Sequence, residues 1–114
     1  MKALLLQFAG PERMRQLGRL ARIPAEWHVA EPRWPHFRLQ IEAVQPDFIV
    51  LDLSKQPTHG IDTAIYLKKS SDYAGIPLYV VNATPAAERK LFVRVPGVPS
   101  LSLEGLLERL QRGN

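Results

Sequence analysis

The chain has 114 residues, of which 46% are hydrophobic, and it contains no cysteine. This length fits one domain over residues 1–114, and the lack of cysteine excludes disulfides and thiolate metal sites. Fifteen Lys and Arg against eleven Asp and Glu leave a net charge of +4, a mild bias that does not by itself indicate a nucleic-acid-binding surface. No apolar run reaches the ~20 residues of a membrane-spanning helix or forms the core of a secretory signal, so we expect a cytoplasmic protein.

The first half of the chain alternates between short apolar runs and segments with helical spacing, and prolines end the helices. The predicted order is a strand at residues 3–8, a helix that begins at Gly10-Pro11 and ends before Pro24, a strand at 27–30, and a helix at 37–44.

The second half continues this alternation. The predicted order is a strand at residues 48–53, a helix at 61–69, strands at 78–82 and 91–95, and a final helix that begins at Ser102-Leu103-Glu104 and stops at Gly113. Such alternation predicts a parallel sheet that is covered by helices on both faces. Asp52 would then lie at the C-terminal tip of a buried strand, where open α/β sheets bind their ligands.

The connection between the last two predicted strands is short. Only eight residues separate Asn82 from Leu91, whereas a parallel crossover with its helix takes ten to twelve or more. Thr84 as N-cap and Pro85 at the first helical position could begin a helix, which would have to be a stub. Alternatively, the last strand runs antiparallel beside its neighbour and needs no crossover helix.

The residues around Asp52 carry a family resemblance. Pro46-Asp47 before an apolar run, Asp52 at its end, Gly60 downstream and a strand after Pro77 resemble the receiver domain of bacterial response regulators over nearly the whole chain. The resemblance implies an α/β, three-layer flavodoxin-like fold with a parallel five-stranded sheet in the order 2-1-3-4-5, here with a shortened fourth helix. It also places Asp52 at the position of the phosphoacceptor aspartate, beside the switch point of the sheet.

Other positions depart from the family pattern. The two acidic residues that hold Mg²⁺ in receivers correspond here to Gln7 and Phe8, which cannot replace two hard carboxylate ligands. The switch hydroxyl corresponds to Asn82, and the lysine of the last strand corresponds to Val95. We therefore expect no metal site, and we expect Asp52 to be a poor phosphoacceptor, because the metal normally neutralises the charge of the transferred phosphoryl group.

These expectations combine into one functional hypothesis. The chain is interpreted as a degenerate receiver-like domain that binds a protein partner in signalling or regulation, with no enzymatic activity, cofactor or membrane contact. Asp52 is then vestigial and could face Lys55. Two alternatives remain: a working phosphoacceptor with an unusual metal site, and a basic nucleic-acid-binding accessory protein. The oligomeric state and the partner's identity are left open.

Overall fold

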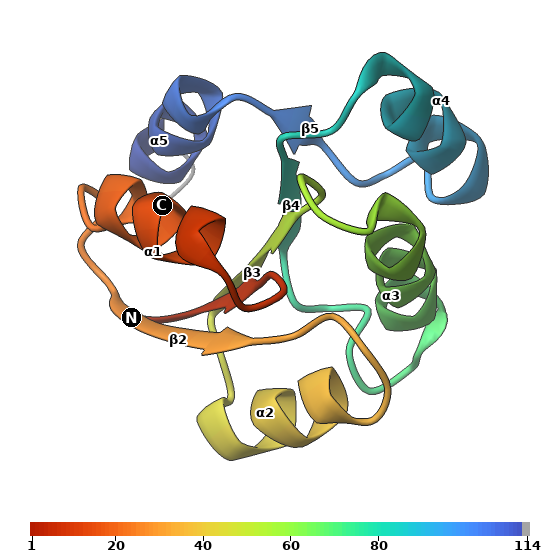
Figure 1. Ribbon diagram of the computed structural model, residues 1–114. Helices are drawn as coiled ribbons and strands as arrows, with labels where there is room; N and C mark the ends of the chain where they lie inside the picture. The colour runs from red at the N-terminus through yellow and green to blue at the C-terminus, as the bar shows by residue number, and fades with distance from the viewer. Residues whose placement is uncertain (113–114) are drawn as a thin grey trace.

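Within residues 1–112, which the computed structural model describes, five parallel strands form one sheet in the order β2-β1-β3-β4-β5 (Figure 1). This order confirms the predicted topology, and the parallel pairing of the last two strands excludes the antiparallel alternative. The strands are β1 (Lys2–Leu6), β2 (Glu26–Ala30), β3 (Phe48–Asp52), β4 (Leu78–Val81) and β5 (Ser100–Leu101).

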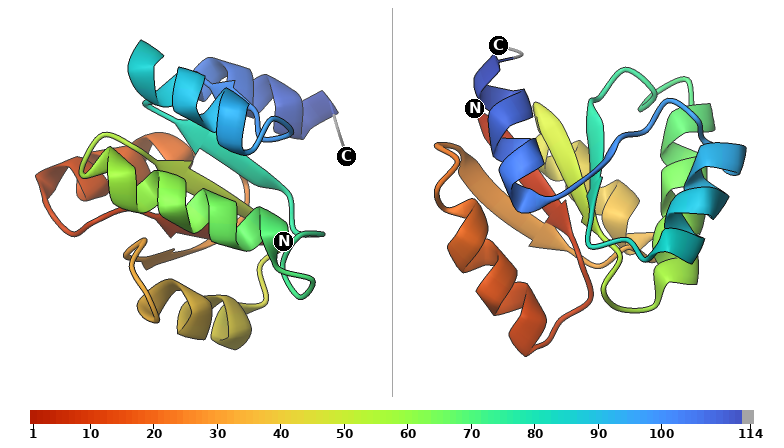
Figure 2. Two further views of the ribbon diagram at one scale, coloured as in Figure 1. Left: turned by 90° about the vertical axis from the view of Figure 1, so that its right-hand side faces the viewer. Right: turned by 90° about the horizontal axis from the view of Figure 1, so that it is seen from above.

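Helices cover both faces of the sheet and produce the three expected layers. Helices α1 and α5 lie on one face, while α2, α3 and α4 lie on the other (Figure 1, Figure 2). The predicted stop of the last helix at Gly113 lies outside the described residues. The helices are α1 (Pro11–Leu20), α2 (His36–Val44), α3 (Pro57–Lys69), α4 (Pro85–Arg94) and α5 (Leu103–Arg112).

Strand alternation divides the apolar core into two clusters. In β1, Leu4 and Leu6 point into the cluster shared with α2, α3 and α4, whereas Ala3 and Leu5 point into the cluster shared with α1 and α5. Successive side chains of a strand point to opposite faces. Because both faces are covered, β3 is buried at every position, which explains its continuous apolar run.

The fourth helix is not shortened, and the strand predicted at residues 91–95 is wrong. These residues complete α4 and its C-cap, so the helix has ten residues, and β5 begins at Ser100. The predicted start is confirmed, because Thr84 Oγ1 accepts a hydrogen bond from the backbone N–H of Ala87 at 3.2 Å and Pro85 is the first helical residue. The connection from β4 to β5 therefore has room for a normal crossover.

The burial pattern explains why a strand was predicted there. Residues 91–95 are rich in β-branched and aromatic types, which favour strands. However, the buried residues are Ala87, Leu91 and Val95, which recur four apart as on one helical face, while Phe92 and Val93 are 73% and 76% exposed. Residues 91–95 alone do not reveal this helical spacing, because its first buried residue is Ala87.

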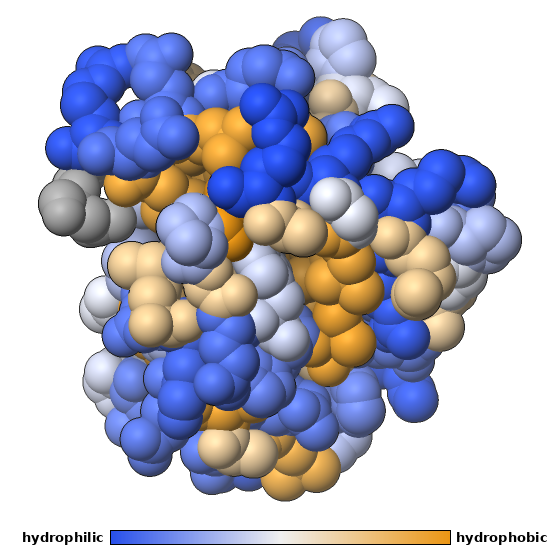
Figure 3. Space-filling view, turned by 90° about the vertical axis from the view of Figure 1, so that its left-hand side faces the viewer, coloured by the Kyte–Doolittle hydropathy of each residue, from blue (hydrophilic) through white to orange (hydrophobic). Residues whose placement is uncertain are grey.

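The face formed by α1 and α5 retains some apolar surface. Figure 3 shows hydrophobic atoms between hydrophilic side chains on this side of the molecule. A hollow of about 240 Å³ between the end of α5 and the start of the chain is lined mainly by Met1, Ile23, Pro24 and Leu107. No helix within residues 1–112 is long and apolar enough to cross a bilayer.

Gly60 tests how tightly α3 packs on the sheet. A Cβ atom at Gly60 would lie 2.2 Å from Cδ2 of the buried Leu53, so the Leu53 side chain would have to shift within the packed core. We expect Gly60→Ala to lower the free energy of unfolding by about 1–3 kcal/mol, measured by urea denaturation. The matched control is Gly18→Ala in α1, where no atom lies within 4 Å and helix propensity should raise stability by about 0.5–1 kcal/mol. Equal effects of the two changes would contradict close packing at Gly60.

Candidate functional site

Asp52 is the last residue of β3 and lies at the carboxyl edge of the sheet. It pairs with Val81 of β4 and is only 1% exposed. Alternation along β3 sends Phe48 and Val50 into the cluster under α1 and α5, and Asp52 continues on that side. Its carboxylate therefore points toward α1 rather than into solvent.

Three neutral donors surround the Asp52 carboxylate. Oδ1 accepts a hydrogen bond from the backbone N–H of Ser54 at 2.8 Å. Oδ2 accepts from Gln16 Nε2 at 3.0 Å and from Asn82 Nδ2 at 2.9 Å. A buried charge is costly unless it is hydrogen-bonded, and these bonds offset part of that cost. Both oxygens are thus occupied by groups of the protein itself.

Asn82 reaches the carboxylate because its backbone is left-handed. Alternation from Leu78 and Val80 would direct its side chain toward the opposite face of the sheet. Its φ of 59° turns the chain after β4, a conformation that Asn tolerates better than most residues. The residue at the expected switch position therefore donates a hydrogen bond to Asp52.

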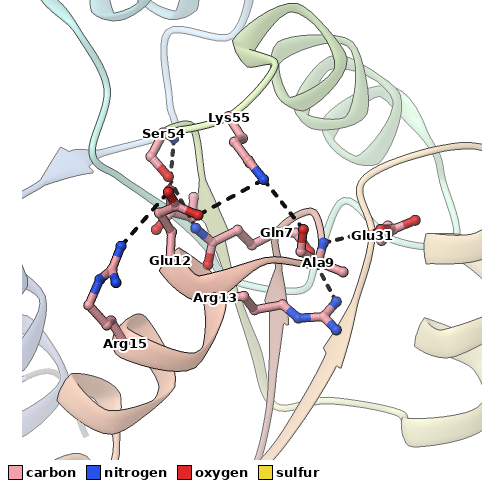
Figure 4. A network of polar contacts seen from close by, with 9 residues as sticks. Gln7, Ala9, Glu12, Arg13, Arg15, Glu31, Ser54 and Lys55 are labelled. Atoms are coloured by element: carbon pink, nitrogen blue, oxygen red, sulfur yellow. Dashed lines mark hydrogen bonds and ion pairs between the residues drawn. The ribbon is translucent and has the colours of Figure 1, made fainter.

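Gln7 occupies the tip of β1 next to Asp52. It is 1% exposed, and its Nε2 donates to Ser54 Oγ at 3.1 Å, so it contacts the same loop as Asp52 (Figure 4). Its Oε1 is buried and accepts no hydrogen bond from residues 1–112. Gln7 and Asn82, two of the four predicted switch-point neighbours, thus lie at the site.

The other two predicted neighbours take no part in the polar cluster. Phe8 packs edge-on against His59 in the first turn of α3, with ring centroids 5.7 Å apart. Val95 is buried in the core at the C-cap of α4, so its assignment to the tip of the last strand is wrong. The segment from Pro96 to Ser102, which contains β5, has no lysine or arginine either.

Lys55 contacts other groups than the expected Asp52. Its Nζ lies 3.5 Å from the carbonyl oxygen of Ala9 and 3.9 Å from Glu12 Oε2 (Figure 4). Gly10 leaves room for this contact, because a Cβ there would lie 2.8 Å from Nζ. Lys55 therefore joins the loop after β3 to the loop after β1.

Glu31 holds the same β1 loop from the other side. Its Oε2 accepts a hydrogen bond from the backbone N–H of Ala9 at 3.1 Å (Figure 4). Its Oε1 lies 2.7 Å from Arg33 Nε. The Ala9 hydrogen bond first, and then Arg33, lower the pKa of Glu31 below its ordinary value. Glu31 thus favours its charged form in the folded protein.

The donor set around Asp52 does not fit Mg²⁺, the ion that the receiver fold implies. Mg²⁺ prefers oxygen ligands, usually one or two carboxylates with several waters. Neutral N–H groups already occupy both oxygens of Asp52, and Glu31 at the tip of β2 is engaged by the backbone N–H of Ala9 and by Arg33. Within residues 1–112, no three His, Asp or Glu side chains gather as metal ligands.

Sequence reasoning missed Gln16 and Ser54. Gln16 lies on the buried face of α1, one turn before the buried Leu20, and is only 4% exposed. A polar residue on the inner face of an amphipathic helix is a signal that it meets a buried polar partner. The sequence therefore indicates that Gln16 has a buried polar partner, but it does not identify that partner as Asp52.

Solved structures show which proteins share this fold. Neither a family model nor a curated protein matches the chain. The chemotaxis protein CheY4 of Vibrio cholerae is 19% identical with a TM-score of 0.72, and the match covers 97% of this chain and 96% of that one. The signal receiver domain of a response regulator from Bermanella marisrubri is 17% identical with a TM-score of 0.75, covering 96% and 94%. A putative response regulator from Chloroflexus aurantiacus is 14% identical with a TM-score of 0.75, covering 96% and 93%.

Gln16 tests the hydrogen bonding of Asp52. Gln16→Met keeps the side-chain volume but removes a donor to a buried carboxylate, so we expect stability to fall by about 1.5–3 kcal/mol. Gln40→Met is the control, because Gln40 makes no side-chain hydrogen bond among the described residues, and it should change stability by less than about 0.5 kcal/mol. Urea unfolding of both variants measures the difference. Similar values for both would show that Gln16 does not support Asp52.

The lowered pKa of Glu31 predicts that the stability of the protein depends on pH. Because its pKa is lowered in the folded state, its ionised form stabilises the protein above the ordinary glutamate pKa of 4.5, and this contribution is lost as pH falls through the lowered value. We expect Glu31→Gln to be less stable than the parent at neutral pH, and the difference to narrow as the pH falls below 4.5. Urea unfolding at several pH values measures it. A constant difference down to pH of about 3 would contradict the assignment.

Proposed function

We propose, from the premise that this chain has the fold of response-regulator receiver domains, that it is a degenerate receiver which acts as a protein-interaction module in signalling or regulation. In this proposal Asp52 is not phosphorylated, the domain spans residues 1–114, and it works in the cytoplasm without enzymatic activity. The observation that carries the proposal is the occupied carboxylate of Asp52, with Gln16 and Asn82 on one oxygen and Ser54 on the other.

Burial supports an unreactive Asp52. A phosphodonor must approach a carboxylate oxygen in line with its leaving group, whereas Asp52 is 1% exposed. Freeing Oδ2 requires loss of the hydrogen bonds from Gln16 and Asn82, at about 1.5–3 kcal/mol for each bond to a charged group. No described cation hydrogen-bonds or pairs with the carboxylate to neutralise the incoming charge.

The similarity to receivers supports a signalling role through its fold alone. The matching structures include response regulators and the receiver domain of a histidine kinase from Syntrophus aciditrophicus. Fold similarity leaves the chemistry to the site itself. A domain that acts through its binding surface needs this fold, but it does not need an aspartate that can be phosphorylated.

One observation favours the second candidate, a phosphoacceptor with an unusual metal site. Gln7 Oε1 and Glu12 Oε2 are buried and accept no hydrogen bond from the part of the chain that the structure describes. Water or a cation satisfies buried acceptors of this kind. We favour the first candidate because Glu12 Oε2 already lies 3.9 Å from Lys55 Nζ, which leaves a single amide oxygen to attract an ion.

A chemical phosphodonor tests the proposal. We expect incubation with acetyl phosphate and Mg²⁺ to leave the intact mass of the chain unchanged. A stoichiometric, hydroxylamine-labile adduct that is absent from Asp52→Asn would refute the proposal. An NMR titration with Mg²⁺ alone tests the second candidate, which requires saturable shifts of the amide signals of Gln7 and Glu12.

A further inference from the structure

The outer side of the α3–α4 pair carries a groove that the site around Asp52 does not use. The two helices lie side by side on the same face of the sheet (Figure 1, Figure 2). Between them is a hollow of about 520 Å³. Its lining combines apolar and charged residues, mainly Ile61, Asp62, Ala86, Arg89, Lys90 and Val93.

Helix α4 presents one face to the core and another to this groove. Ala87, Leu91 and Val95 pack inward, whereas Ala86, Arg89, Lys90 and Val93 share the neighbouring face by their spacing of three and four. Val93 is 76% exposed. Burial of such an exposed aliphatic side chain against a partner is favourable in free energy, and the other apolar residues of the hollow extend the apolar surface.

The charges around the groove are mostly positive and unpaired. Arg89, Lys90 and Arg94 line it, and none makes an ion pair with any residue between 1 and 112. Asp62 is the one carboxylate in the lining. Unpaired cations around an apolar floor are complementary to a segment that carries carboxylates around an apolar anchor.

We propose that the α3–α4 groove binds an acidic segment of a protein partner, with an aliphatic or aromatic side chain against Val93 and Ile61 and carboxylates on Arg89, Lys90 and Arg94. This inference rests on the proposed role as an interaction module and names the chemistry of its partner. A second copy of the chain fits poorly, because each copy carries a net charge of +4. Nucleic acid also fits poorly, because the groove offers no stacking aromatic and Asp62 repels phosphate.

Selection from a library of random peptides tests the chemistry of the partner. We select phage-displayed peptides of about 12 residues against the full chain. Peptides of this length can place contact residues on successive turns of a helix. We expect enriched peptides to carry Asp or Glu around one aliphatic or aromatic residue. Amide shifts caused by one enriched peptide should cluster on the facing sides of α3 and α4.

Matched variants test the groove residues. Arg89→Glu should weaken binding of the enriched peptide by about tenfold or more, because it reverses a charge at the contact. Arg19→Glu on α1 makes the same change of charge elsewhere and should keep the affinity within about twofold. Val93→Ser should weaken binding by about fivefold, whereas Phe92→Ser should not. Phe92 is equally exposed on the same helix but lines the neighbouring hollow instead.

Several results would overturn the inference. These are failure to enrich any peptide, enrichment of neutral or basic peptides, shifts away from α3 and α4, and equal losses in Arg89→Glu and Arg19→Glu. Displacement of the peptide by a DNA duplex, with affinity that falls steeply with salt, would assign the groove to nucleic acid. The outcome of the phosphodonor experiment is independent of this one. If the peptide binds the groove and Asp52 is also phosphorylated, the proposed function is refuted, whereas the assignment of the groove stands.

Discussion

A buried carboxylate joins three separate segments of this chain at one edge of the sheet. Asp52 ends β3, and its partners come from α1, from the loop after β3 and from the turn after β4. Removing a charge from water is costly, so each donor that loses its place leaves part of that cost uncompensated. The interaction therefore constrains the approach of α1, the left-handed turn at Asn82 and the path of the Ser54 loop at the same time.

The same hydrogen bonds give the site its chemical character. Amide and backbone N–H groups stabilise the charge that Asp52 already carries, but they bring no positive charge for an additional phosphoryl group. Around this centre, Lys55 and Glu31 fasten the loop after β1 through Ala9. The edge of the sheet that binds ligands in many α/β proteins is here held together by internal contacts, which is consistent with a structural rather than a reactive role.

The apolar core and the site around Asp52 use different residues. The two apolar clusters lie on the faces of the sheet, whereas the site is built from residues at the strand ends, the loop after β3 and Gln16 of α1. On α4, Ala87, Leu91 and Val95 pack inward, while Arg89, Lys90 and Val93 line the groove beside α3.

The sequence predicts parallel pairing for the first four strands, because β3 is a continuous apolar run, prolines mark the helix ends, and both signals are local; it leaves the direction of the last strand open. It also placed Asp52 at a strand tip and Gln7 beside it. The end of α4 was not determined in this way: the composition of residues 91–95 favours a strand, and burial of Leu91 and Val95 against α3 and the sheet selects a helix. The partners of Asp52 follow from tertiary packing, since Gln16 lies 36 residues away along the chain. Packing of α1 on the sheet brings the two together, and no local pattern encodes that contact.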